Sequence, residues 1–258
     1  MSALILAGVA TLVFCAPGYP GAAGDAQPYV DQFARTAAAS AGWSPGSLAA
    51  VYDPTEHGGL AKLDDRDSVL AFVPYAFYVQ HGAALHLTPL VQADVVGVGA
   101  EERWTLVGKA GGTVTGAASM SGHTILSAAG YAPDFVKGTA LIAWPLPADV
   151  KIETTGQILS ALRRVASGEP AVALLDGTQS AALTSLPFAA QLKTLVQSAP
   201  VPVALIAVVE SRLPAPRAKS MQAALLKMNA ASGGADVLAS LHLKGFVPLK
   251  LPGSAARP

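Results

Sequence analysis

The sequence has only one cysteine, Cys15, among its 258 residues. A single cysteine can form no intramolecular disulfide and cannot build a cysteine-based zinc site. Charge of either sign is also scarce, since 17 lysines and arginines balance 17 aspartates and glutamates. Without a net field, the chain lacks the electrostatic means to recruit nucleic acid or an anionic membrane surface. We therefore expect no nucleic-acid partner.

Several catalytic motifs are missing as well. Ser127, His57 and Asp176 supply the residue types of a hydrolase, but no G-x-S-x-G nucleophile elbow occurs. The five histidines show no H-E-x-x-H or other metal spacing. The glycine-rich stretch 97–99 lacks the third glycine of a dinucleotide-binding loop. The stretch 108–116 lacks the Gly-Lys-Ser/Thr of a P-loop. We expect a binding protein without metal or cofactor; a hydrolase-like enzyme is the less favoured alternative.

After the N-terminal segment, no apolar run reaches the roughly 18 residues that a membrane helix needs. We therefore expect a soluble body. Residues 1–24 carry no charge, so the apolar stretch 3–16 resembles a secretory signal core without the basic residue that should precede it. We interpret 1–10 as a possible signal remnant ending in a small-residue cleavage site, and 11–15 as the first core strand. A wholly structural N-terminus is the alternative.

Cys15 closes this first apolar run and has two interpretations. A lipid-modified cysteine would need a small residue before it, but Phe14 is bulky. Free cysteine is among the most buried residue types. We favour a buried thiol over a lipid anchor.

What the sequence does contain is a regular alternation of short apolar runs and amphipathic segments, which is typical of an α/β organisation. The length allows two lobes of roughly 100 residues each. In the first helix, Tyr29, Phe33 and Ala37 fall at i, i+4 and i+8 on one face. For the first lobe we predict strands at 11–15, 47–52, 68–73 and 85–91 and helices at 25–41, 55–63 and 75–81.

A second unit repeats the same pattern after the apolar and charged stretch 95–103. Its predicted strands are 104–109, 124–127, 150–154, 172–175 and 192–196, with helices from about 132, at 156–166 and near 179. A last strand at 203–209 and helices at 214–228 and 234–241 are assigned to the first lobe. The domains are thus 11–94 and 201–258 for lobe 1 and 95–200 for lobe 2, with a cleft between them.

Residues just past the predicted strand ends are rich in hydroxyls, small side chains and tyrosine. Ligands of open α/β sheets lie beyond the carboxyl ends of the strands. The turn 127–131 (SAAGY) before a helix would let an anionic or polar group approach the backbone N–H groups, unless Ser127 is only a cap. The candidate ligand-binding residues are Tyr19, Tyr52, His57, Tyr75, Ser127, Ala128, Tyr131, Thr155 and Asp176.

Several segments also occur in a familiar order: 104–109, then ASMSG at 118–122 before 124–127, LVQSAPVP at 195–202 and LASLHLKGF at 238–246. This order resembles the phosphate/phosphonate-type solute-binding proteins of ABC transporters. The resemblance implies a type II periplasmic-binding-protein fold with a hinge of crossing strands. It also implies export to the periplasm or another extracytoplasmic space and a membrane permease as partner.

The resemblance further implies that the ligand's oxyanion sits at the helix start after the first strand of lobe 2. Ser127 matches the first hydroxyl position there, whereas Ala128 and Ala129 replace expected hydroxyls. Tyr52 and Tyr75 match aromatic positions at strand ends, and Asp176 matches an acidic position facing the cleft. We expect a monomer that captures a small polar or anionic ligand for uptake; ligand sensing for a membrane receptor is the alternative.

Overall fold

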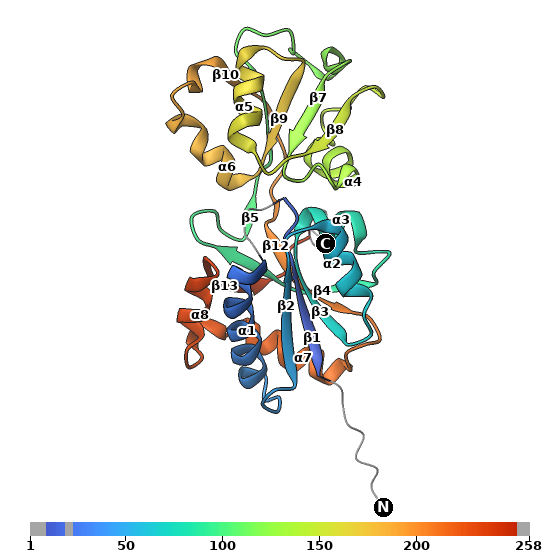
Figure 1. Ribbon diagram of the computed structural model, residues 1–258, viewed down its shortest axis with the longest axis vertical. Helices are drawn as coiled ribbons and strands as arrows, with labels where there is room; N and C mark the ends of the chain where they lie inside the picture. The colour runs from blue at the N-terminus through green and yellow to red at the C-terminus, as the bar shows by residue number, and fades with distance from the viewer. Residues whose placement is uncertain (1–8, 19–22, 252–258) are drawn as a thin grey trace, which may run out of the picture.

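The computed structural model describes residues 9–18 and 23–251. These residues form two lobes, each built around its own β-sheet and joined by extended segments (Figure 1). The prediction of a two-lobed α/β fold is therefore confirmed. No helix within the described ranges is long and apolar enough to span a membrane. Tyr19 and residues 1–8, including most of the possible signal remnant, lie outside these ranges.

Lobe 1 contains a six-stranded sheet in the order β13-β4-β12-β3-β1-β2. Strand β1 pairs in parallel with β2 and β3, whereas β12 runs antiparallel to β3 and β4. The strands are β1 (Ala10–Cys15), β2 (Leu48–Asp53), β3 (Ser68–Pro74), β4 (Leu87–Val95), β12 (Ala204–Val209) and β13 (Leu243–Pro248). The returning chain thus places β12 in the middle of a sheet made mostly by the N-terminal part.

Helices cover both faces of this sheet. In β1, Leu12 and Phe14 pack toward one group of helices, while Val13 and Cys15 pack toward the other. Successive side chains of a strand point to opposite faces, so a strand buried on both faces must be continuously apolar. The first group is α1 (Ala23–Ser40), α7 (Ala215–Leu225) and α8 (Gly234–Ser240); the second is α2 (Glu56–Asp64) and α3 (Tyr75–His81).

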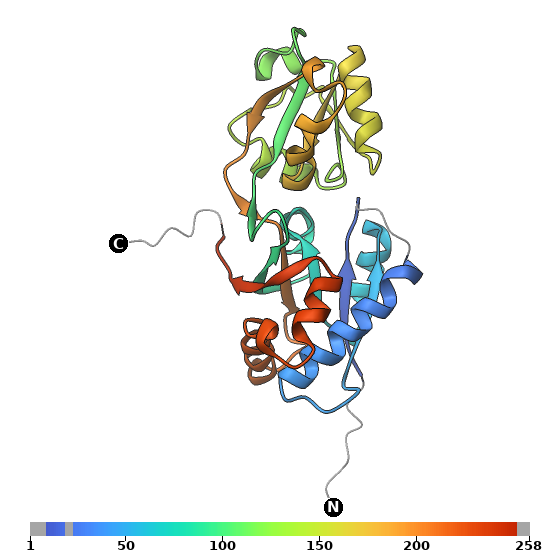
Figure 2. The same cartoon turned by 90° about the vertical axis from the view of Figure 1, so that its left-hand side faces the viewer.

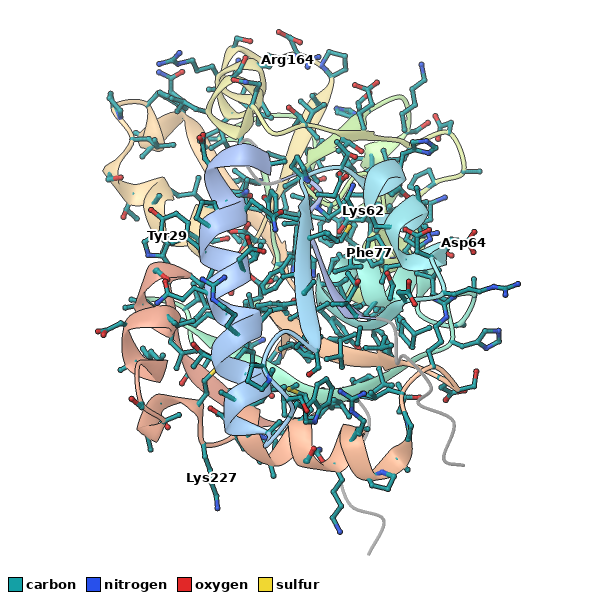
Figure 3. The ribbon with its side chains drawn as sticks, turned by 60° about the horizontal axis from the view of Figure 1, so that its bottom comes forward. Tyr29, Lys62, Asp64, Phe77, Arg164 and Lys227 are labelled. Carbon is teal, nitrogen blue, oxygen red and sulfur yellow. The ribbon has the colours of Figure 1, made fainter. Side chains whose placement is uncertain are left out.

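Helix α1 buries a stripe slightly different from the predicted one. Phe33 packs edge-on against Phe14, with 5.4 Å between the ring centroids. Tyr29 does not share this buried face: it is 48% exposed and points away from the sheet (Figure 3). An α-helix turns by about 100° per residue, so positions four apart are offset by about 40°. The stripe that contains Phe33 therefore continues through Val30 and leaves Tyr29 at its margin.

Lobe 2 contains a five-stranded sheet in the order β10-β6-β9-β7-β8. Its strands are β6 (Thr105–Lys109), β7 (Thr124–Ser127), β8 (Lys151–Thr154), β9 (Ala171–Leu175) and β10 (Leu192–Gln197), and its α-helices are α4 (Pro133–Phe135), α5 (Ile158–Ser167) and α6 (Gly177–Ala182). The helix predicted from about 132 is only the short α4, which continues as a π-helical turn, η2 (Val136–Ala140). Gly138 lies in this turn, and glycine disfavours a regular helix.

Two short antiparallel strands, β5 (Glu101–Glu102) and β11 (Val201–Pro202), connect the lobes. Figure 2 shows both connecting segments on the same side of the molecule. Two polypeptide crossings on one side form a hinge, because the lobes can approach or separate on the other side by small changes in these segments.

Candidate functional site

A cavity of about 260 Å³ lies between the lobes, next to the crossing strands. Its walls come from the ends of β1, β2 and β3, from β5, and from the start of α6. Open α/β sheets bind ligands at this edge, beyond the carboxyl ends of their strands. The residues lining this interlobe cavity are Phe14, Cys15, Ala16, Tyr52, Phe72, Val73, Pro74, Val95, Glu102, Asp176, Thr178, Val203, Ala204 and Leu241.

A larger groove, of about 920 Å³, lies on the outer surface of lobe 1 between α1 and α7. Lys227, one of its lining residues, extends away from lobe 2 in Figure 3. This groove is open, and it is remote from the strand ends at which the fold gathers its functional loops. The interlobe cavity is therefore the better candidate for a ligand site.

Two carboxyl groups form one end of the interlobe cavity. Glu102 on β5 is 6% exposed and accepts a 2.7 Å hydrogen bond from the backbone N–H of Gly177. Asp176 is 2% exposed and caps α6, where its Oδ1 accepts a 2.8 Å hydrogen bond from the N–H of Gln179. Burial raises the pKa of Glu102 to about 8; the Gly177 hydrogen bond opposes this rise, and the charge of Asp176 adds to it.

The lobe 1 side of the cavity combines aromatic rings with the Cys15 thiol. Phe14 and Phe72 pack with 5.1 Å between their ring centroids, and Tyr52 stands at the end of β2. Burial, followed by the influence of Cys15, raises the pKa of Tyr52. Burial also raises the pKa of Cys15 to about 12, so the thiol is protonated at neutral pH. The structure thus places Cys15 in the core as a buried thiol.

The SAAGY turn lies outside the interlobe cavity and is used within the protein. Ser127 is completely buried, and its hydroxyl donates a 2.8 Å hydrogen bond to the carbonyl of Leu174 in β9. The same oxygen accepts the N–H of Ala129 at 3.2 Å. Ala128 is 2% exposed and lies against the segment after β1, where a Cβ on Gly18 would come within 2.2 Å of the Ala128 carbonyl oxygen. The turn is therefore shaped to receive a backbone segment of lobe 1.

The other predicted residues occupy varied positions. Tyr52 and Asp176 both line the interlobe cavity, so the structure brings these two together. Tyr75 begins α3 and packs edge-on against Phe135 of lobe 2, at 6.2 Å between centroids. Tyr131 of lobe 2 borders a small gap together with Pro17, Pro74 and Ala76 of lobe 1. Burial, followed by the influence of Cys15 and Glu56, raises its pKa.

Thr155 and His57 lie away from the cavity lining. The N–H of Thr155 donates to the carbonyl of Ser127 at 2.8 Å, and its hydroxyl accepts the N–H of Gln157 at 3.0 Å. His57 is an exposed residue in the first turn of α2. Among the described residues, no group of three or more histidine, cysteine, aspartate or glutamate side chains could hold a metal ion.

Glu102 is the most important cavity residue that the sequence reasoning missed. The sequence places Glu102 in the charged stretch between the two predicted lobes and gives it no role in ligand binding. Two features of the sequence could have indicated that Glu102 lines the cavity. Segments that connect two lobes form the base of the cleft between them, and side chains alternate along a strand, so that only one of Glu101 and Glu102 is expected to be buried. In the structure Glu101 is exposed and Glu102 is buried.

The two lobes are in contact across the cleft. The N–H of Asp134 on α4 donates to Oε1 of Gln80 on α3 at 2.9 Å, and Nε2 of Gln80 donates back to Asp134 at 3.3 Å. Tyr75 of lobe 1 also packs against Phe135 of lobe 2, with 6.2 Å between the ring centroids. One apolar cluster runs continuously from the α2 and α3 side of lobe 1 into lobe 2. The described conformation is therefore a closed one.

Several solved structures share this two-lobed architecture. The structure of XAC2383 from Xanthomonas citri bound to ATP is 15% identical, with 94% of this chain and 92% of that chain covered and a TM-score of 0.68. A binding protein component of an ABC phosphonate transporter from Pseudomonas aeruginosa is also 15% identical, over 92% and 80% of the two chains, with a TM-score of 0.59. PhnD1 from Prochlorococcus marinus in complex with methylphosphonate is 12% identical, over 93% of each chain, with a TM-score of 0.55.

Comparison at the level of sequence gives the family. No curated protein matches the chain. The family model described as "ABC transporter, phosphonate, periplasmic substrate-binding protein" matches residues 110–251, more than half of the chain. Together with the two-lobed fold, this match shows that the chain belongs to the phosphonate-type periplasmic substrate-binding proteins of ABC transporters.

Proposed function

We propose that the protein binds a small polar ligand in the interlobe cavity and presents its closed form to the permease of an ABC importer. The observation that carries this proposal is the placement of the cavity between the strand ends of lobe 1, the crossing strand β5 and the first turn of α6. Side chains from both lobes line it, so a ligand there would stabilise the closed arrangement.

Tyr52, Glu102, Asp176 and Thr178 are the proposed polar contacts of the ligand. They come from β2, β5 and the start of α6, and they surround an otherwise mainly apolar cavity. A few polar groups in an apolar cavity are typical of small-molecule sites, in which they fix the orientation of the ligand. Typical sites measure about 300–1,000 Å³, and a cavity of about 260 Å³ accordingly suits a small ligand.

Four other predicted residues are assigned to closure of the lobes instead of to ligand contact. Tyr75, Tyr131 and Ala128 lie where one lobe meets the other. The Ser127 hydroxyl is engaged with β9, which supports the geometry of this contact.

Binding without turnover is proposed for the same cavity. Nucleophilic catalysis needs an activated group, and a cysteine nucleophile in particular needs a lowered pKa. The pKa of Cys15 is instead raised to about 12 by burial. Among the residues that the structure describes, no histidine lines the cavity to serve as a base. We propose further that the protein acts as a monomer outside the cytoplasm, in keeping with the periplasmic role of its family.

A cavity-blocking substitution tests the proposal. Thr178 is exposed on the first turn of α6 and borders the cavity, so Thr178→Phe should obstruct ligand entry with little effect on folding. Thermal-shift screening of small polar compounds identifies a ligand, which at 100 times its dissociation constant adds about 2.7 kcal/mol of stability. Thr178→Phe should lose this stabilisation, whereas Thr113→Phe, at an exposed position in lobe 2 that does not line the cavity, should keep it. Equal binding by both variants would place the ligand elsewhere.

A further inference from the structure

A pair of reciprocal hydrogen bonds joins the two lobes at their rim. Gln80 lies near the end of α3 in lobe 1, and Asp134 lies in the first turn of α4 in lobe 2. The N–H of Asp134 donates to Oε1 of Gln80 at 2.9 Å, and Nε2 of Gln80 donates to the Asp134 carboxyl at 3.3 Å. Neither residue lines the interlobe cavity. The pair therefore acts between the lobes without contacting a ligand in that cavity.

The side chain of Gln80 fits the start of α4 because this helix has no side-chain cap of its own. The first N–H groups of a helix find no partner within it. The residue before a helix often supplies a side-chain oxygen, but Ala132 precedes α4 and has none. Gln80 provides the oxygen from the other lobe, and its amide also offers a donor for the Asp134 carboxyl. Lobe 1 thus completes a helix end of lobe 2 while the lobes are closed.

This contact lies away from the crossing strand β5. In Figure 1, α3 and α4 face each other on the right of the place where the lobes meet, and β5 lies on the left. When a lobe rotates about a hinge, the atoms furthest from the hinge move most, so separation of the lobes breaks such hydrogen bonds early. Beside the pair, the buried ring of Tyr75 packs against Phe135. Gln80 and Asp134 therefore form the polar rim of an apolar contact between the lobes.

A hydrogen-bonded pair at this rim is strong enough to influence closure. Gln80 is half-buried and Asp134 is exposed, and exposed polar pairs add little to the stability of a fold. Opening and closing is a much finer balance, because the minor form of a two-state protein is commonly populated at about 0.1–10%. A tenfold change in the closing equilibrium would alter these populations substantially.

We propose that Gln80 and Asp134 form a latch that holds the lobes closed and thereby sets the affinity of the interlobe cavity for its ligand. This inference rests on the proposed function of the cavity, and it adds two residues that regulate binding without touching the ligand. A ligand that binds the closed form has an apparent dissociation constant equal to its intrinsic one divided by the closed fraction. Weakening the latch therefore weakens binding in the same proportion.

The first experiment places like charges in the latch. Gln80→Glu can still accept the Asp134 N–H, but it removes the Nε2 donor and brings two carboxyl groups together. The ratio of closed to open molecules should fall by about 10- to 100-fold. Single-molecule FRET measures this ratio with dyes on two introduced cysteines at exposed positions, Ser44→Cys in lobe 1 and Thr113→Cys in lobe 2. Gln191→Glu, the same change at an exposed position of lobe 2, is the control and should leave the ratio unchanged.

A second substitution separates the latch from general damage to α3. In the double variant Gln80→Glu/Asp134→Asn, the new amide can donate to the new carboxyl group, and the like charges no longer face each other. The ratio of closed to open molecules should return to within about threefold of that of the unmodified chain. An unchanged ratio in Gln80→Glu, or a lowered ratio that Asp134→Asn does not restore, overturns the inference.

Titration with methylphosphonate relates the latch to binding. Its apparent dissociation constant should rise in Gln80→Glu by the factor by which the closed fraction falls, and it should recover in the double variant. If the closed fraction changes and recovers as expected but the dissociation constant does not follow it, the latch stands and the proposed ligand site in the closed cavity is wrong. If the closed fraction is the same in all variants, the latch is wrong, and Thr178→Phe still tests the proposed function separately. If methylphosphonate binds to none of the variants, the FRET result alone decides on the latch.

Discussion

Replacing Glu102 by glutamine should change how the stability of the protein depends on pH. Glu102 is 6% exposed, and burial raises the pKa of its carboxyl from an ordinary value of 4.5 to about 8. The glutamine side chain is nearly the same shape, and its amide oxygen can still accept the hydrogen bond from Gly177. Glu102→Gln therefore removes the ionisation and keeps the local packing.

The size and sign of the effect follow from proton linkage. Above pH 4.5 the unfolded chain has lost this proton, whereas the folded protein keeps it until about pH 8. Because the folded state binds more protons in this interval, Glu102 lowers the free energy of unfolding by about 1.4 kcal/mol for each unit of rising pH. The whole interval corresponds to about 5 kcal/mol. Below pH 4.5 the two proteins should be similarly stable, and above pH 8 the variant should be more stable by up to that amount.

Urea unfolding of both proteins at pH values from 4.5 to 9 measures this difference. Subtracting the two free energies at each pH cancels the groups that titrate equally in both. The difference should grow between pH 5 and 8 and then level off, and Glu101→Gln should show no such growth because residue 101 is exposed. Parallel stability curves for the unmodified chain and Glu102→Gln would refute the argument, since they would mean that Glu102 ionises as readily when folded as when unfolded.

Three further predictions follow from close contacts in the structure. Gly59→Ala should lower the free energy of unfolding by about 1–3 kcal/mol, because the new Cβ would lie 2.0 Å from the Cys15 sulfur. Urea unfolding measures this loss, with Gly24→Ala, which has no atom within 4 Å of its new Cβ, as the control. An unchanged free energy of unfolding in Gly59→Ala would contradict the packing. In the folded protein, Cys15 should react with a thiol reagent at pH 8 about 1,000-fold more slowly than an ordinary cysteine, because burial raises its pKa from 9 to about 12. Rapid labelling of the folded protein would contradict this prediction, since it would show an accessible thiolate. Gly18→Ala should hold the lobes apart, because its Cβ would lie 2.2 Å from the Ala128 carbonyl oxygen. Small-angle X-ray scattering should then give a larger radius of gyration than for the control Gly46→Ala. Gly46 also has a positive φ, but no atom lies within 4 Å of its new Cβ.

Most secondary-structure elements could be predicted from the sequence because their signals are local. The apolar runs that become β1, β3 and β9 are buried on both faces, and such strands need uninterrupted apolar residues. The strand expected at 85–91 is shifted to Leu87–Val95, which places Gln92 and Asp94 inside a strand. When polar residues lie within a strand, the pattern of hydrophobicity does not indicate where the strand ends.

The site could be predicted only in part. Tyr52 lies at the end of an apolar strand and Asp176 directly follows one, and both line the interlobe cavity because the ends of such strands gather at one edge of each sheet. Ser127 satisfied the same rule, yet its hydroxyl is engaged with Leu174. The direction in which a side chain points at a strand end depends on its neighbours in the sheet, and the sequence of one strand does not contain that information.

The sequence by itself determined the α/β class, the alternation of strands and helices, the apolar strands of both sheets and the scarcity of charge. These properties depend on residues that are close together in the chain, where periodicity and chain stiffness act directly. Only the tertiary structure decided that β12 enters the middle of the first sheet and that Gly18 meets Ala128. It also decided that Glu102 meets the start of α6, 75 residues away from its hydrogen-bond donor. The closed lobes bury this glutamate, and its burial sets the charge of the cavity, because the free energy of a carboxylate depends on the surroundings that distant parts of the chain provide.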